Sequence, residues 1–394
     1  MLSRYKYRFY PNTDQSLRLA QTFGCCRLVY NHILAEIKAK NITKLSSNDL
    51  KKQVPYLKTV FPFLKDVSSV ALQQSLDKLG ISFKNFFDSR KGKRKGNKMG
   101  FPQFKKRSNQ QSATFQSNGY QLQSDGSINV AKVGTIKPIY SRALPSVPTS
   151  ITIIKDCSNR YFVSFVVQAE PVQIPSQSPS IGIDLGIKTF AACSDGSTYS
   201  SPSVYKRLYA KIAKLQRKYD KRQQKGSNRR TKTRISIAKL YARIADIRKD
   251  FLHKVSTLVC SKNQTVSIEN LNVSGMLKNR KLSKAISRQG WGEFGTLVQS
   301  KCIKYGRNFV EIGRWEPTSQ ICNSCGFRWG KLDLSVRTIT CLNCGCTHDR
   351  DENAAKNINN IGMGHRHDVK CTQRACKTED IRVYAKDTAV FVEA

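Results

Sequence analysis

Two Cys-x-x-Cys pairs constrain the fold of this chain more than any other feature of its sequence. Fifteen residues separate the first pair, Cys322 and Cys325, from the second pair, Cys341 and Cys344. This spacing is typical of a zinc site with four thiolate ligands. A glycine follows the second cysteine of each pair, as the tight turn of a metal knuckle requires. Four protein thiolates complete a tetrahedral shell, so we expect one structural Zn²⁺, with Cys346 close enough to compete for the fourth position.

A second constraint is the stretch SIGIDLGIKTFAAC at residues 180–193, in which two apolar runs flank one carboxylate. The pattern predicts a buried strand that ends at Asp184, a tight turn through Gly186, and a second strand from Thr189. A carboxylate in such a place loses hydration, so it needs a cation or a metal as its partner. The alternative is an aspartate that only forms the turn.

Further acids stand at the ends of other predicted elements. QTVSIEN predicts a strand that ends on Glu269, FVEIGRW predicts a strand over residues 309–315, and HDRDENAAKNI predicts a helix that begins at Asp349–Asp351. A sheet can bring such acids together, and clustered carboxylates repel one another unless divalent cations lie between them. Two Mg²⁺ ions about 3.5–4 Å apart can activate water and stabilise the leaving oxygen in phosphodiester cleavage. Asp349 can instead serve only as the helix N-cap.

The charge balance indicates a polyanionic partner. The chain of 394 residues carries 68 Lys and Arg against 27 Asp and Glu, a formal net charge of +41. Self-repulsion of this size favours nucleic acid as the partner, although a ribosomal or architectural protein would show the same balance. The length fits about two or three domains. We find no transmembrane run or secretory signal, and the thirteen cysteines are an odd number, so we expect a reduced protein of the cytoplasm rather than a disulfide framework.

The N-terminal part combines strands with amphipathic helices. The opening residues alternate aromatic and basic side chains, which predicts a half-buried strand that ends at Pro11. Asn12 and Gln15 form a capping box before a helix, and a second helix carries an apolar stripe from Leu72 to Phe86. Residues 114–167 predict short strands, with the clearest hairpin between 151–154 and 161–167.

Two basic segments are candidates for contact with a nucleic-acid backbone. The segment Lys84–Arg107 is predicted to be a loop in which Phe101 and Phe104 stand among ten basic residues, and a solvated charged loop is the alternative. Residues 203–254 predict an antiparallel helical hairpin with a coiled-coil-like seam. Its outer faces carry more basic residues than pairing within the helices can neutralise. Arg328, Trp329, Lys331 and Arg337, between the cysteine pairs, are further candidates for contact with nucleic acid, and exposed residues of a small ribbon are the alternative.

The histidines and the C-terminal residues carry less information. The five histidines show no ligand spacing with the acids, and a weak metal site at His365-x-His367 is less favoured than a polar tail. Residues 363–394 have weak periodicity, so we expect them to be mobile.

These motifs together resemble the TnpB family of transposon-encoded, RNA-guided nucleases, which is related to the type V CRISPR effectors. The resemblance rests on GIDLGIKTFAA, SIENL, the two Cys-x-x-Cys-Gly knuckles and DRDENAAKNI in this order, and on the opening YKYRFYPN and the FPQFKKR loop. It covers about residues 1–362.

The resemblance implies a multidomain α/β protein. Its nuclease domain would be RuvC-like, with the RNase H fold and an inserted zinc ribbon, and its N-terminal half would be a wedge-type β barrel interrupted by a helical recognition domain. The metal acids and catalytic residues implied are Asp184, Glu269 and Asp351, all present, with Mg²⁺ as the cofactor. The implied partners are a guide RNA transcribed from the transposon end and double-stranded target DNA beside a short adjacent motif.

The predicted domains follow from this assignment. They are the barrel (1–10 and 100–172), the helical domain (11–99), a linker (173–180), the nuclease domain (181–315 and 347–362, with the basic hairpin at 203–258), the zinc module (316–346) and a disordered tail (363–394).

The leading hypothesis is therefore an RNA-guided, Mg²⁺-dependent DNA endonuclease. One alternative is an RNA-guided DNA-binding repressor that does not cleave, against which the intact set of acids argues. Another is an RNase H-fold transposase or resolvase that needs no RNA. The sequence leaves the adjacent motif, the guide, the cut positions and the oligomeric state open.

Overall fold

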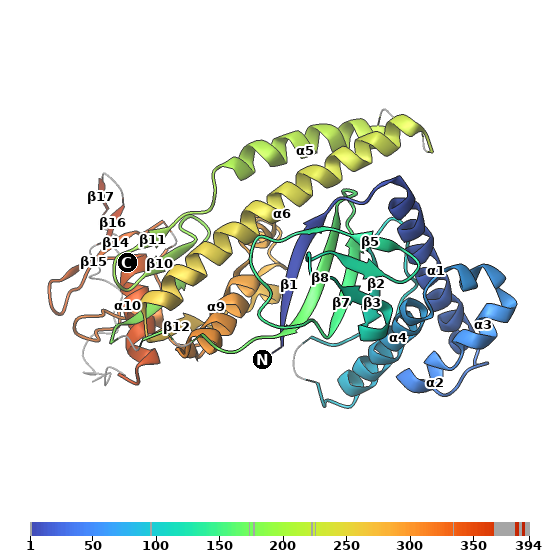
Figure 1. Cartoon of the computed structure of the whole chain (residues 1–394). Coiled ribbons are helices and arrows are strands. Elements are labelled where there is room, and N and C mark those ends of the chain that lie inside the picture. The colour runs from blue at the N-terminus through green and yellow to red at the C-terminus, as the bar shows by residue number, and fades with distance from the viewer. Residues whose placement is uncertain are drawn as a thin grey trace. The chain divides into compact units, whose positions relative to one another are not determined.

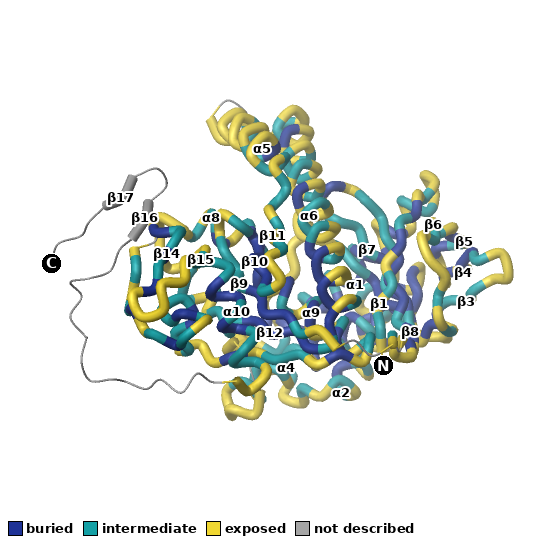
Figure 2. Tube along the Cα trace, turned by 90° about the vertical axis from the view of Figure 1, so that its left-hand side faces the viewer, coloured by how far each residue is buried: buried dark blue, intermediate teal, exposed yellow. Residues whose placement is uncertain are grey.

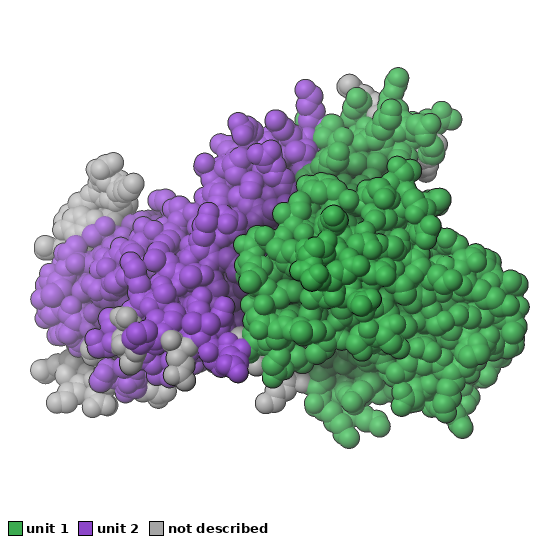
Figure 3. Space-filling view, in the orientation of Figure 1, with its two compact units in different colours: residues 1–169, 215–239 green, residues 170–214, 240–394 purple. Residues whose placement is uncertain are grey.

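The computed structural model describes residues 2–94, 97–172, 174–175, 178–221, 224, 226–333 and 335–365, and the backbone of two short strands at 383–385 and 388–390 (Figure 1). The chain divides into two compact units (Figure 3). Unit 1 comprises residues 1–169 and 215–239, and unit 2 comprises residues 170–214 and 240–394. Among the described residues, no helix combines the length and the apolar character that crossing a membrane requires.

Unit 1 contains a five-stranded antiparallel sheet built around the first strand of the chain. Its order is β2 (Gln111–Gln116), β7 (Ser150–Lys155), β8 (Tyr161–Gln168), β1 (Leu2–Phe9) and β6 (Pro138–Ile139). Tyr7 and Phe9 are buried while Arg4 and Lys6 are exposed, so the predicted alternation of the first strand is confirmed. The predicted hairpin is also confirmed, because β7 and β8 pair antiparallel.

A smaller sheet and the helices complete the core of unit 1. The second sheet has the order β3 (Tyr120–Leu122), β4 (Ile128–Val130) and β5 (Gly134–Ile136), and a 3₁₀ turn, η2 (Ser117–Gly119), precedes it. Side chains from both sheets and from the helices form one hydrophobic cluster, and buried positions are dark blue in Figure 2. The hydrogen-bonded strands thus form two sheets, and closure into a barrel stays a prediction.

The predicted capping box and both predicted helices of unit 1 are confirmed. The Asn12 side chain accepts from the Gln15 backbone amide at 2.8 Å, and the Gln15 side chain accepts from the Asn12 amide at 3.0 Å. One prediction is wrong: Lys84–Arg90 belongs to helix α4 and not to a loop, and its Phe86 ring packs edge to face against Phe87 and Phe101. The helical elements are α1 (Thr13–Lys38), α2 (Ser47–Lys51), α3 (Val54–Val60), η1 (Pro62–Asp66) and α4 (Ser69–Arg90).

Two long basic helices follow, as predicted. They are α5 (Val204–Lys221) and α6 (Asn228–Lys262), and α6 continues beyond the predicted end of the hairpin at residue 258. Within unit 1, the Arg230 guanidinium of α6 lies 4.2 Å from the ring centroid of Tyr219 on α5. The seam between the helices stays a prediction.

Unit 2 is organised around a five-stranded mixed sheet. Its order is β11 (Thr198–Tyr199), β10 (Ala191–Cys193), β9 (Ser180–Leu185), β12 (Thr265–Glu269) and β13 (Asn308–Ile312). Strands β9, β12 and β13 are parallel, while β10 and β11 are antiparallel, so the predicted strand–turn–strand at residues 180–193 is confirmed. The strand predicted over residues 309–315 ends at Ile312 instead, because the Glu316 amide donates to the Gly313 carbonyl at 3.3 Å and closes a turn.

The two faces of this sheet have different neighbours. Ile181 and Ile183 pack into a hydrophobic cluster with residues of α6 and α9 (Trp291–Tyr305). Gly182 points to the other face, where helix α10 (Arg350–Gly362) lies so close that a Cβ at this position would meet the Ala355 carbonyl oxygen at 2.1 Å. The glycine of the sequence GID therefore permits the close approach of α10 to β9. Two short helices, α7 (Val273–Met276) and α8 (Ser283–Gln289), connect β12 to α9.

The cysteine module of unit 2 consists of short strands and turns. It contains η3 (Thr318–Gln320), β14 (Thr338–Thr340) and β15 (Thr347–Asp349), and β14 also pairs with β16 (Val383–Ala385), which pairs with β17 (Thr388–Val390). Apart from residues 363–365 and these two strands, the predicted mobile tail lies outside the described residues, as do His367 and part of the predicted linker.

Candidate functional site

Three acids from separate parts of the chain line one cavity of unit 2. The cavity has a volume of about 570 Å³, and Asp184, Glu269 and Asp351 all contribute to its wall. Asp184 stands near the end of β9, Glu269 is the last residue of β12, and Asp351 lies in the first turn of α10. These three positions are the candidates predicted from the sequence, and the structure brings them to one place.

The sheet and one helix explain this convergence. The parallel strands β9 and β12 pair Ile183 with Ile268, so the next residues, Asp184 and Glu269, leave the sheet at the same edge. Side chains alternate along a strand, so Asp184 shares the face of Gly182, against which α10 packs. The N-terminus of α10 then presents Asp351 to the same cavity, and its dipole favours a nearby negative charge.

Burial raises the proton affinity of two of the acids, Asp184 and Glu269. Burial, together with the charges of Glu269 and Asp351, raises the pKa of Asp184 to about 7, although the Arg350 guanidinium acts in the opposite direction. Burial also raises the pKa of Glu269, which a hydrogen bond from Thr318 partly offsets. These carboxylates therefore lie in an environment that a bound cation would stabilise.

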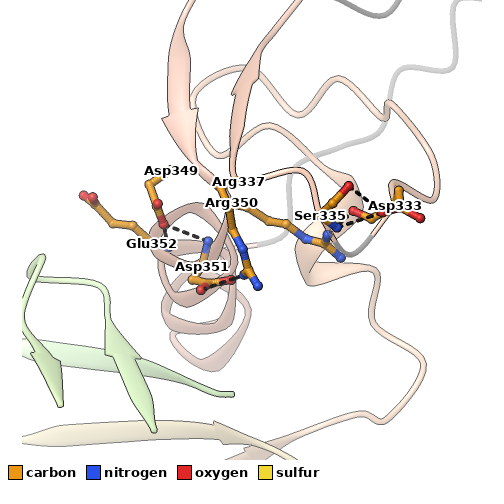
Figure 4. Close-up of polar contacts among 7 residues, drawn as sticks. All are labelled: Asp333, Ser335, Arg337, Asp349, Arg350, Asp351 and Glu352. Atoms are coloured by element: carbon orange, nitrogen blue, oxygen red, sulfur yellow. Dashed lines mark hydrogen bonds and ion pairs between the residues drawn. The ribbon is translucent and has the colours of Figure 1, made fainter. Parts of the chain in front are cut away.

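Two of the acids have a fixed partner. The Thr318 hydroxyl donates to the Glu269 carboxylate, and the Arg337 guanidinium forms an ion pair with Asp351 at 3.2 Å (Figure 4). In the described part of the chain, the metal-binding atoms of the four cysteines all lie within 4.8 Å of one another. The carboxylate oxygens of the three acids do not meet this distance. The arginine of the cysteine module thus neutralises the third acid in this structure.

Asp349 has the alternative role that the sequence left open. Its carboxylate accepts hydrogen bonds from the backbone amides of Asp351 and Glu352 at 2.9 and 3.0 Å, so it is the N-cap of α10 (Figure 4). This cap fixes the first turn of the helix and with it the position of Asp351.

Several residues of the cavity were not found from the sequence. Arg337 was named only as a possible contact to nucleic acid, and its pairing with Asp351 follows from tertiary structure alone. Lys188, Arg314 and Arg350 also line the cavity. Arg350 alone had a signal that could have identified it, since it stands between the two aspartates of the DRD motif.

The four cysteines form a compact group with the dimensions of a zinc site. The Sγ atoms of Cys322 and Cys344 lie 3.7 Å apart, and those of Cys325 and Cys341 lie 3.6 Å apart. A tetrahedral zinc ion with Zn–S bonds of about 2.3 Å would place its sulfur ligands about 3.8 Å apart. The four thiols therefore fit a zinc ion.

The turns and neighbours of this group agree with the predicted knuckles. Gly326 and Gly345 have φ values of 74° and 71°, in the left-handed region that favours glycine. The Cys346 carbonyl accepts from the Cys341 amide at 2.9 Å, while its side chain is exposed and outside the cluster. His348, for which the sequence indicated no role, places its Nε2 atom 3.2 Å from the Cys322 Sγ atom.

Two asparagines attach the cysteine module to α10. Asn353 and Asn357 are one turn apart and buried, and their side-chain amides donate to the Ile321 carbonyl at 2.7 and 2.8 Å. The Asn323 backbone amide donates back to the Asn353 side chain at 2.9 Å. The helix that carries Asp351 is therefore braced by the module that carries Arg337.

A separate basic cavity lies in unit 1. It has a volume of about 560 Å³, and its lining includes Arg27, Arg107, Lys155 and Arg234. An adjacent smaller cavity contains Lys105, whose pKa is lowered to about 8 by burial and by the neighbouring charge of Lys78. These cations would be stabilised by an anion such as phosphate.

The fold and the sites define a multidomain α/β protein in which one unit holds an acidic cavity beside a four-cysteine module. Three family models match the chain: OrfB_IS605, described as "Probable transposase", over residues 164–280, the Cas12f1-like TNB domain over 291–358, and the OrfB_IS605 helix-turn-helix domain over 1–40. The chain belongs to the TnpB family, OrfB_IS605. Strand β1 and helix α1 lie within the range that the third model matches.

Two curated relatives match almost the whole chain. A protein of Streptomyces pristinaespiralis named "Putative RNA-guided DNA endonuclease" is 39% identical over 371 residues, which cover 91% of this chain and 89% of that protein. "Putative RNA-guided DNA endonuclease InsQ" of Escherichia coli K12 is 31% identical over 394 residues, with 92% of each covered.

The similarity to solved structures is weaker. The chain aligns with a structure titled "Cryo-EM structure of the Cas12f1-sgRNA-target DNA complex" at 16% identity and a TM-score of 0.49, over 89% of this chain and 83% of that one.

Proposed function

We propose that this protein is an RNA-guided DNA endonuclease that hydrolyses phosphodiester bonds with Mg²⁺ at the acidic cavity of unit 2. The observation that carries the proposal is the presence of Asp184, Glu269 and Asp351 in one cavity. The names of the two relatives described above support the same activity.

The architecture of unit 2 supports a RuvC-like nuclease domain. Three parallel and two antiparallel strands form the mixed sheet, and α10 covers the face that carries the acids. The cysteine module lies in the sequence between β13 and α10, so it is an insertion before the last acid.

The acids fit divalent cations. Asp184 and Glu269 have raised pKa values because burial and, for Asp184, neighbouring carboxylates disfavour the charged form, and divalent cations would relieve both effects. Mg²⁺ bound by Asp184, Glu269 and Asp351 would activate water and stabilise the leaving oxygen. Thr318 donates to the Glu269 carboxylate and orients it, and Arg337 pairs with Asp351, which would have to leave Arg337 to bind a cation.

The four-cysteine group fits a Zn²⁺ ion with a structural role. Its four thiols would complete the tetrahedral shell and leave no position for a substrate. Through Asn353 and Asn357 the folded module supports the start of α10, so zinc would act on the acidic cavity by positioning Asp351.

The basic surfaces support nucleic-acid partners. The net charge of +41 and the basic cavity of unit 1 suit contacts with phosphates, which give affinity without reading sequence. We propose that these surfaces hold a guide RNA from the transposon end and the heteroduplex that it forms. Base pairing then reads the target sequence, and the protein reads a short motif beside it.

The test is a cleavage assay on the purified full-length protein. Co-purifying RNA is sequenced, and DNA that matches its guide segment is incubated with and without Mg²⁺. We expect cleavage only with Mg²⁺, loss of cleavage but not of RNA binding in Asp184→Ala, and full activity in the surface control Asp250→Asn, whose side chain is 62% exposed.

The other outcomes decide between the alternatives. Bound RNA without Mg²⁺-dependent cleavage would favour a guided DNA-binding protein. Cleavage that survives removal of the RNA would favour an RNA-independent transposase or resolvase.

A further inference from the structure

Trp315 is an exposed tryptophan beside the acidic cavity. It is 91% exposed, whereas Trp291 and Trp329, the other tryptophans of the chain, are 4% and 6% exposed. Trp329 packs within the cysteine module and donates to the Ser319 carbonyl at 3.2 Å, so it is structural and not an exposed contact. A tryptophan whose side chain is almost fully exposed to solvent is a candidate for binding a partner.

The turn that carries Trp315 is held in place on both sides. The Arg314 side chain donates to the Asn270 carbonyl at 3.3 Å and to the Asn270 side-chain oxygen at 2.8 Å. On the other side, the Thr318 hydroxyl donates to Glu269, the residue before Asn270. The turn is thus attached to the end of β12, and the position of Trp315 is fixed relative to one of the three acids.

The residues around Trp315 face the cavity. Arg314 and Glu316, its two chain neighbours, both line the acidic cavity, so Trp315 lies next to the cavity wall, although it is not itself one of the lining residues. Arg337, Arg350 and Lys188 add positive charge to the same wall. Cations beside an exposed aromatic ring are the combination with which proteins hold single-stranded nucleic acid, because the cations bind phosphates and the ring stacks on a base.

We propose that Trp315 is a base-stacking residue that binds one nucleotide of a single-stranded segment beside the acidic cavity. A base within a duplex is covered on both faces by its neighbours, so only an unpaired base offers its face to the indole. Stacking of this kind tolerates any base, as a nuclease directed by a guide requires. The proposal rests on the proposed function, since it takes the substrate of the cavity to be a nucleic-acid strand.

Intrinsic fluorescence tests the proposal without cleavage. The full-length protein is titrated in Mg²⁺-free buffer with a thymidine decamer, and separately with a decamer of the same length that carries abasic sites. Because the other two tryptophans are buried, quenching by the oligonucleotide reports on Trp315. We expect quenching by the thymidine decamer and little quenching by the abasic decamer.

Variants at the same position give a second readout. Trp315→Ala should weaken binding of the thymidine decamer by about 5- to 100-fold, and Trp315→Phe should restore most of the affinity while removing the quenching. The control Ile303→Ala, which removes another exposed apolar side chain of unit 2, should change neither the affinity for the decamer nor the quenching. Thermal unfolding of each variant verifies that the fold is intact.

The outcomes separate this proposal from the proposed function. Cleavage of matched DNA by a protein that shows no base-dependent quenching would overturn the role of Trp315 and leave the nuclease standing. Base-dependent quenching without any Mg²⁺-dependent cleavage would overturn the nuclease and leave the role of Trp315 standing. Equal quenching by both decamers, or fluorescence that changes only with protein concentration, would mean that the indole contacts backbone or a second copy of the chain, and would overturn stacking.

Discussion

Replacing Asp184 by asparagine should stabilise the metal-free protein at alkaline pH. The carboxyl has a pKa of about 7 in the folded protein, because burial and the charges of Glu269 and Asp351 oppose its ionisation, against an ordinary value of 3.8. In the unfolded chain the group ionises near its ordinary value. The folded state therefore loses stability as the pH rises from about 4 to about 7, and an uncharged asparagine removes this loss.

The size of the effect follows from the two pKa values. Their difference corresponds to a loss of folding stability of at most about 4 kcal/mol above pH 7, of which about 1.7 kcal/mol is already lost at pH 5. This free-energy difference is an upper limit, because Asp184 lines a cavity in which solvent would screen its charge. Since each kcal/mol moves the Tm of a unit of this size by about 2–4 °C, the Tm advantage of Asp184→Asn should grow by about 3–10 °C between pH 5 and pH 8.

The assay is thermal unfolding of wild type and variant at both pH values, with zinc retained and Mg²⁺ omitted. Asp250→Asn, a change on the exposed face of α6, is the control and should shift Tm equally at both pH values. Addition of Mg²⁺ at pH 8 should raise the Tm of the wild type more than that of Asp184→Asn. A pH-independent difference between the two proteins, or a less stable variant at pH 8, would refute the account of the acidic cavity.

Two further predictions concern the scaffold. Gly182→Ala should destabilise unit 2 by at least about 3 kcal/mol and lower the Tm, because its Cβ would meet the backbone of α10. The control Gly292→Ala should not lower the Tm, because nothing lies within 4 Å of its Cβ. Cys322→Ser should lower the Tm and reduce bound zinc, measured by elemental analysis, from one ion per chain to well below one. The control Cys157→Ser, at an exposed cysteine outside the cluster, should change neither the zinc content nor the Tm. Loss of zinc with unchanged unfolding would contradict a stabilising role for the metal.

Local patterns in the sequence predicted most of the elements. The alternation of Tyr7 and Phe9 with basic residues, the capping box at Asn12 and the strand–turn–strand around Asp184 all depend on near neighbours in the chain, and the structure confirms them. The predicted ends of two elements were wrong. Helix α4 continues to Arg90, and β13 stops at Ile312 where a turn begins.

The sequence by itself determined the residue types and the spacing of both sites. The two cysteine pairs predicted a metal knuckle because its ligands lie close together in the chain. The three acids were recognisable as strand-end and helix-start positions, and through the resemblance to TnpB.

Only the tertiary structure decided that the acids share a cavity and which side chains surround them. Their convergence depends on the pairing of β9 with β12 and on the space that Gly182 leaves for α10. The ion pair of Arg337 with Asp351 and the exposure of Trp315 likewise depend on which segments meet in space. Such contacts join residues distant in the chain, and no local pattern encodes them.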